Sequence, residues 1–141
     1  MKKVTLTFPT GLRVQASIMV EREPALAADF LGKLANGPQT LVCNHAVCAG
    51  KIFDAYMRYD SNPTQAIAGQ CPVTYAQLTS GDLLWDGEKL SVVYGEVMQP
   101  GTAGCVIGKA DNGPVFDKAC LNVWYDIYRE HTVSMITIAE E

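Results

Sequence analysis

A histidine and two cysteines lie within six residues of one another in the segment Cys43-Asn44-His45-Ala46-Val47-Cys48. If this segment is a strand, Cys43 and His45 share one face, because side chains alternate along a strand. An imidazole beside a thiol can activate it as a nucleophile, so His45 could act as a base and Cys43 or Cys48 as a covalent nucleophile. The alternative interpretation is that both cysteines are small buried residues and that His45 is a hydrogen-bonded pocket residue. Two cysteines in a Cys-x4-Cys spacing and one histidine provide too few ligands for zinc, which takes four ligands in paired clusters. We therefore expect no metal.

A second cluster follows on the same β-prone stretch. Alternation places Tyr56 and Arg58 on one face, where a phenol and a guanidinium could hold a carboxylate or an amide. The alternative is a strand end with an ordinary solvated Arg58–Asp60 pair.

A third cluster surrounds a predicted hairpin turn at Asp86-Gly87. Trp85 precedes the turn, and Tyr94 and Glu96 fall on one side of the returning strand. Glu96 at the rim of an apolar cavity could have a raised pKa and act as a general acid or base. The alternative is that Trp85 packs in a core or subunit interface and Glu96 is solvated. Together, the three clusters give His45, Glu96 and Cys48 as catalytic candidates and Tyr56, Arg58, Trp85 and Tyr94 as ligand-binding candidates.

The composition limits the class of protein that carries these residues. The chain has 141 residues, 48% of them hydrophobic and 18% charged, so it predicts one domain, 1–141, with a sizeable core and a weakly charged surface typical of a homo-oligomer. A net charge of −4 and no basic run argue against nucleic acid. No apolar run approaches the length of a membrane span, and no apolar segment follows Lys2-Lys3 as in a signal peptide. Five cysteines, an odd number, favour reduced thiols and a cytoplasmic protein.

Two helices and about eight strands must position the candidate residues. Proline entries and apolar stripes predict helices over 24–34 and 114–128, the second burying Val115 as well as Phe116. Alternation predicts a hairpin over 4–18, a β-prone stretch over 40–57, a hairpin over 81–95, a strand at 105–107 and a closing strand over 131–139. This count favours a mainly β fold, a closed antiparallel barrel capped by helices, over a ferredoxin-like sandwich, which needs fewer strands. Cys105 and Cys120 fit buried packing positions, and Cys71 is the thiol expected to be exposed.

The order of these elements resembles the cyclophilins. The run Cys105-Val106-Ile107 leads to Gly108-Lys109, a turn at Asn112-Gly113 and a helix through Pro114, as in the last third of that fold. Near the other end, Glu23-Pro24 enters a helix that carries an early Phe30. The resemblance covers about half of the chain and implies the same closed barrel.

The middle of the chain departs from the cyclophilins that isomerise prolyl bonds. Their centre reads Phe-His-Arg, whereas the chain has Asn44-His45-Ala46-Val47 and lacks both the arginine and the following Gln-Gly-Gly-Asp. An apolar side chain cannot polarise the amide, so isomerase activity is not expected. The middle is more similar to small bacterial cyclophilin-like proteins of unassigned activity, whose motifs correspond here to 45–50, Gly81-Asp82-Leu83 and Val93-Tyr94-Gly95. Their arginine is replaced by Val47 and their serine by Ala49.

We therefore predict a protein that binds a small organic carboxylate or amide and that could act on it by acid–base chemistry as a hydrolase or lyase. In that case His45 is the base, Arg58 the anion clamp, and Glu96 or Tyr94 the proton donor. No cofactor is expected, because the chain has no glycine-rich dinucleotide loop and no phosphate-cradling motif. Two alternatives stay open: a residual prolyl isomerase or peptide-binding module, and a non-catalytic structural partner of a metabolic enzyme.

Overall fold

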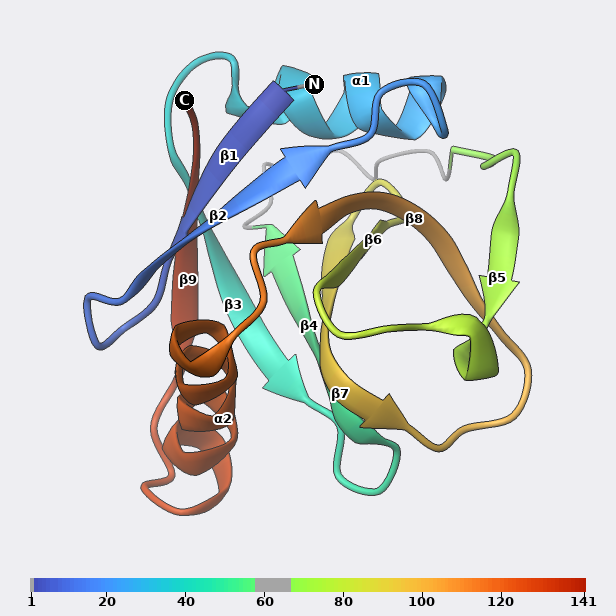
Figure 1. Cartoon of the computed structure of the whole chain (residues 1–141). Helices are drawn as coiled ribbons and strands as arrows, with labels where there is room; N and C mark the ends of the chain where they lie inside the picture. The colour runs from blue at the N-terminus through green and yellow to red at the C-terminus, as the bar shows by residue number, and fades with distance from the viewer. Residues whose placement is uncertain (1, 58–66) are drawn as a thin grey trace.

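The computed structural model describes residues 2–57 and 67–141 of the chain (Figure 1). In chain order the elements are β1 (Lys2–Thr7), β2 (Arg13–Ile18), α1 (Pro24–Leu34), β3 (Gln39–His45), β4 (Gly50–Met57), β5 (Pro72–Thr74), the 3-10 turn η1 (Tyr75–Gln77), β6 (Asp82–Trp85), β7 (Lys89–Val97), β8 (Thr102–Ala110), α2 (Pro114–Tyr128) and β9 (Met135–Glu140).

Eight of the strands form a closed antiparallel barrel in the order β2-β1-β9-β3-β4-β7-β6-β8. The pairing of β2 with β8 closes it, and the short strand β5 pairs with the other part of β8. Closure removes the unpaired edges that an open sheet would present. The predicted barrel is confirmed, with one strand more than expected.

The seam between β2 and β8 depends on a glycine. Ile18 is paired with Gly108, and Ser17 with Lys109. A Cβ at position 108 would lie 2.7 Å from the carbonyl oxygen of Ser17, closer than real Cβ contacts allow, and 3.0 Å from the end of the Ile18 side chain, which is tight. The structure thus explains the glycine of the Gly108-Lys109 motif, because only a residue without a side chain lets the two strands approach closely enough to pair.

Apolar side chains fill the barrel, and the helices cover its ends (Figure 1). Helix α1 contacts β9 and β6, whereas α2 contacts β3 and β7. Under α1, the Trp85 ring meets Phe30 edge-on at 5.1 Å, and its indole N–H donates to Asp29 at 2.8 Å. Burying both large rings supplies core packing, and the hydrogen bond satisfies the polar atom of the indole.

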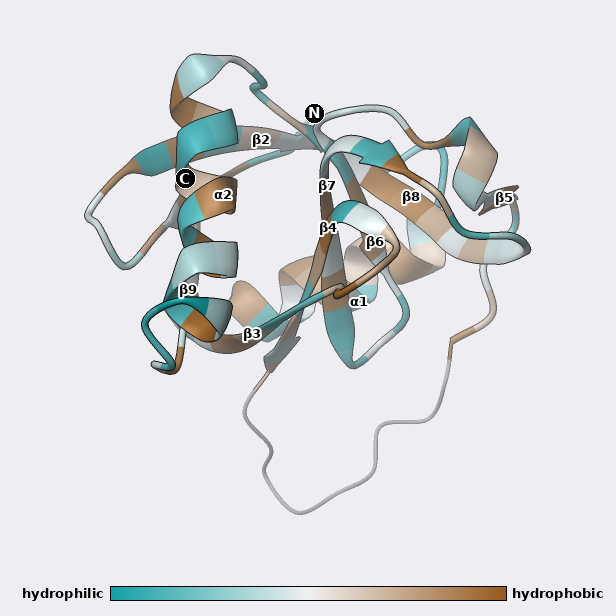
Figure 2. Ribbon diagram, turned by 90° about the horizontal axis from the view of Figure 1, so that it is seen from below, coloured by the Kyte–Doolittle hydropathy of each residue, from teal (hydrophilic) through white to brown (hydrophobic). Residues whose placement is uncertain are grey.

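A second apolar cluster lies on the outer face of the barrel. It contains Ile52, Leu84, Val93 and Val106, and residues of β5, η1 and the following loop pack on it, among them Val73, Tyr75 and Leu78. Strand β6 is therefore buried on both faces, which explains its uninterrupted apolar sequence after Asp82. Figure 2 shows hydrophobic residues, in brown, along the neighbouring strand β8.

The bounds of both helices are confirmed at 24–34 and 114–128. The predicted burial of Val115 is wrong: 53% of it is exposed, whereas Phe116 is 1% exposed. Successive helical residues are separated by about 100° around the axis, and the buried stripe is centred on Phe116, Ala119 and Val123.

The closing strand begins at Met135, four residues later than the predicted start. The chain first wraps the end of α2: the N–H of Thr132 donates to the carbonyl of Asp126 at 2.7 Å, and the Ser134 hydroxyl donates to the Asp126 carboxylate at 3.0 Å. The segment rejoins the sheet at Ser134, whose carbonyl accepts from the N–H of Cys43 on β3 at 2.8 Å. None of the helices that the structure describes is long and apolar enough to cross a membrane.

Two glycine substitutions test the seam. Gly108→Ala should lower the free energy of unfolding by about 1–3 kcal/mol, because its methyl group is forced against β2. In Gly32→Ala, in α1, the added methyl group meets nothing within 4 Å. This substitution should raise the free energy of unfolding by about 0.5–1 kcal/mol. Urea unfolding of both variants measures this contrast. Equal stability of the two variants would contradict a tight seam.

Candidate functional site

His45, at the end of β3, is 4% exposed and makes two hydrogen bonds. Its Nδ1 lies 2.8 Å from the carbonyl oxygen of Ala46, and its Nε2 lies 2.6 Å from the hydroxyl of Tyr94 on β7. A carbonyl can only accept, so Nδ1 carries the proton, and the Nε2 of a neutral imidazole accepts from the tyrosine. The bonding capacity of the ring is satisfied within the protein.

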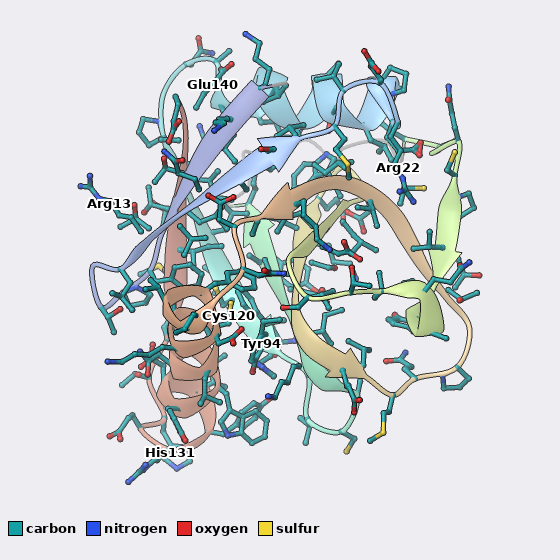
Figure 3. The ribbon with its side chains drawn as sticks, viewed as in Figure 1. Arg13, Arg22, Tyr94, Cys120, His131 and Glu140 are labelled. Carbon is teal, nitrogen blue, oxygen red and sulfur yellow. The ribbon has the colours of Figure 1, made fainter. Side chains whose placement is uncertain are left out.

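Burial keeps both members of this pair neutral. Burial lowers the pKa of His45, and the bond to the Ala46 carbonyl offsets this only in part. Burial also raises the pKa of Tyr94, with smaller contributions from Cys120 and Tyr125. In Figure 3, Tyr94 and Cys120 lie close together where α2 meets the barrel. At pH 7 the hydrogen bond between His45 and Tyr94 therefore joins two uncharged side chains.

Aromatic side chains from α2 close this end of the barrel over His45. The Trp124 ring meets the imidazole edge-on at 5.2 Å, and Phe53 stacks against it at 6.2 Å. The Tyr128 hydroxyl donates to the backbone carbonyl of His45 at 2.6 Å. Helix α2 is therefore tied to the last residue of β3 by packing and by a hydrogen bond.

The structure brings together only His45 and Tyr94 among the candidate residues that it describes. Trp85 points into the core beneath α1, at hydrogen-bond distance from Asp29. Glu96 and Cys48 are exposed, and Tyr56 is half-buried on the outer face of β4. Arg58 lies outside the described residues.

Cys43 shares the buried face of β3 with His45, as alternation predicts. Burial raises the pKa of the Cys43 thiol to about 12. The thiol is therefore protonated at neutral pH, which does not favour nucleophilic chemistry at this position.

A cavity of about 120 Å³ lies on the outer face of the barrel, between β3, β4 and β7 on one side and the η1 turn on the other. Apolar side chains form part of its wall, and polar side chains form the rest; of these polar residues, His45 alone was a candidate from the sequence. The lining residues are Asn44, His45, Ala46, Ile52, Phe53, Asp54, Tyr75, Leu84, Lys89, Ser91, Gln99 and Ala103.

Three neighbouring strands place the polar groups of the cavity in a row. Asn44 on β3 is paired with Asp54 on β4, which is paired with Ser91 on β7. The Ser91 hydroxyl donates to Asp54 Oδ1 at 2.6 Å, and Lys89 Nζ lies 3.5 Å from Asp54 Oδ2. Burial lowers the pKa of Lys89, but Asp54, Tyr56 and Asp86 outweigh it and raise the pKa, so the ammonium stays charged.

The sequence held a partial signal for this row. Asp54 is a charged residue in a β-prone stretch, and Lys89 and Ser91 alternate with the apolar Leu90 and Val92. The pairing of Asp54 with Ser91 could not be foreseen, because β4 and β7 are separated by two other strands in the chain.

The Gly81-Asp82 motif has a structural role instead. The Asp82 carboxylate accepts from the backbone N–H of Thr79 at 2.8 Å and pairs with Lys109 at 2.9 Å. It thereby fixes the turn before β6 to the seam strand β8. Within residues 2–57 and 67–141, no three His, Cys, Asp or Glu side chains gather as a metal site would require.

The lowered pKa of His45 makes stability depend on pH. The unfolded chain binds a proton at this histidine near pH 6.5, about the ordinary value, whereas the folded chain binds it only at lower pH. The stabilisation is therefore complete above the unfolded pKa and is lost as pH falls through the folded pKa.

Urea unfolding at pH 7.5 and pH 5.5 measures this dependence. We expect His45→Gln to flatten the loss of stability between these values and His131→Gln, at the exposed histidine, to leave it unchanged. A steep dependence that survives in His45→Gln would contradict this assignment.

No family model matches the chain, and no curated protein matches it. Among solved structures, it is similar to the structure of McbB in complex with tryptophan, with a TM-score of 0.82 and 16% sequence identity. The match covers 98% of this chain and 44% of McbB, so the chain spans less than half the length of that protein. At this identity the similarity establishes the fold, a closed barrel with two helices.

Proposed function

We propose that the chain is a cyclophilin-like barrel that binds a small organic ligand through a carboxylate or amide group in the outer cavity. The observation that carries this proposal is the convergence of Asn44, Asp54, Lys89 and Ser91 on one cavity, whose accessible lining is mainly polar. Small-molecule sites are concave, and a small number of placed polar groups in them fix the orientation of the ligand.

Each polar group has a separate role in this proposal. The Lys89 ammonium attracts a carboxylate, and the Asn44 amide donates to a carbonyl or carboxylate oxygen. Asp54 accepts from a ligand N–H, and its bond to Ser91 orients it for this. An apolar cavity of about 150 Å³ holds benzene, so the smaller volume here fits the polar head of a ligand and leaves the remainder outside.

We assign His45 a positioning role rather than that of the base. Its ring is satisfied by Tyr94 and Ala46, and its backbone carbonyl is held by Tyr128. These contacts fix the end of β3, on which the neighbouring Asn44 faces outward. Catalytic roles for Glu96 and Cys48 stay predictions.

The similarity to McbB supports a ligand of this kind without identifying it. McbB, 44% of which matches this chain, was solved in complex with tryptophan, an amino acid that carries a carboxylate. The cavity here is polar and small, so a small carboxylate or amide group is the part of a ligand that it accommodates.

Acetate and acetamide are minimal probes of the site. We expect both to shift the backbone amide resonances of residues that line the cavity, such as Asn44 and Ser91, with dissociation constants in the millimolar range, as for weak fragments. Lys89→Met should weaken acetate binding by roughly 10-fold and leave acetamide binding nearly unchanged, because only the carboxylate uses the ammonium.

Lys51→Met is the matched control, because Lys51 lies on β4 but does not line the cavity. It should bind both probes as the unmodified protein does. The proposal is wrong if acetate and acetamide shift no cavity resonances, or if the two lysine variants lose acetate binding equally.

A further inference from the structure

Two cysteines that the cavity does not use lie next to each other where β5 joins β8. Pro72 of β5 is the register partner of Cys105 of β8, so Cys71 directly precedes the paired position. Cys71 is therefore diagonal to Cys105 and not directly opposite it, so a disulfide would have to bridge this offset within the Cα separation of about 4.4–6.8 Å that disulfides span. Cys71 is exposed, whereas Cys105 is 8% exposed.

A buried carboxylate holds this segment over the Cys105 sulfur. Glu23, which precedes α1, is 1% exposed and accepts from the backbone N–H groups of Gln70, at 2.5 Å and 3.0 Å, and of Cys71, at 3.0 Å. The Cys105 thiol lies beside this carboxylate and near the Cys71 N–H, because each of the two contributes to the pKa of Cys105. Gly69 packs so closely on that sulfur that a Cβ would overlap it.

The two thiols differ in their accessibility to an oxidant and in their protonation. Burial raises the pKa of Cys105, and the negative charge of Glu23 raises it further, so this thiol stays protonated. Burial also raises the pKa of Glu23, but the bonds from Gln70 and Cys71 outweigh it and keep the carboxylate ionised. Cys71 is thus the accessible thiol, and Cys105 is a protected thiol with a proton acceptor beside it.

We propose that Cys71 and Cys105 are a redox pair that forms a disulfide with a low-molecular-weight disulfide as the oxidant. The Cys71 thiolate attacks the oxidant, forms a mixed disulfide and releases one thiolate. Cys105 gives its proton to Glu23 and attacks the Cys71 sulfur, which expels the second thiolate. The two cysteines are oxidised by two electrons, the small disulfide is reduced to two thiols, and the leaving thiolates take up both protons.

The product would bind β5 covalently to β8. Strand β5 has three residues, and its pairing with β8 is interrupted by a register shift. The same strand leads directly into Tyr75, on the wall of the cavity. Oxidation would therefore fix the short strand that supports one side of this wall.

Glutathione disulfide tests the proposal on the full chain. The protein is incubated with it, the remaining thiols are alkylated after unfolding, and peptides are mapped by mass spectrometry. We expect a peptide that links Cys71 to Cys105, an intact mass lower by two hydrogen atoms, and reversal by dithiothreitol. Cys105→Ser should instead accumulate glutathione on Cys71, because the second thiol is missing.

Cys48→Ser is the matched control, since Cys48 is the other exposed thiol. It should form the Cys71–Cys105 link as completely as the unmodified protein does. The proposal is overturned if Cys71 of the unmodified protein retains glutathione while Cys105 stays alkylatable, or if Cys71 links to Cys48 instead.

Discussion

The pairing of β2 with β8 is the constraint on which the rest of the structure depends. These strands are far apart in the chain, and their three register pairs convert a curved sheet into a closed barrel. The approach requires Gly108, because any side chain there would meet the backbone of Ser17. Once the barrel is closed, its interior accepts the apolar faces of all eight strands, and its two ends are open to the two helices.

The remainder of β8 determines what lies outside the barrel. Strand β5 extends the sheet there, and the η1 turn that follows covers the apolar patch around Leu84 and Val93. The polar row Asn44–Asp54–Ser91 lies at the border of this covered patch. The cavity exists because a small outer layer stops short of these polar residues, and the link between His45 and α2 holds the neighbouring strand end in place.

Local patterns in the sequence predicted the elements well and their contacts poorly. Proline entries and apolar stripes were enough for both helices, because those signals lie within a dozen residues. Strand β5 has three residues, too few for alternation to be recognised. His45 was predicted to be a base, with a hydrogen-bonded pocket residue as the alternative. Its bond to Tyr94 and the pairing of Asp54 with Ser91 depend on the order of strands around the barrel. Trp85 lies in the core, which was one of two places that the sequence left open, because an aromatic residue beside a turn fits a rim as well as a core.

Native mass spectrometry most directly tests the claim that the outer cavity binds a small molecule. The protein is purified from cell extract without added ligand and compared with the Lys89→Met, Ser91→Ala double variant under gentle and denaturing conditions. We expect a small carboxylate or amide that is retained by the unmodified protein, released on denaturation and absent from the variant. Retention of the same molecule by the variant at equal occupancy would contradict it.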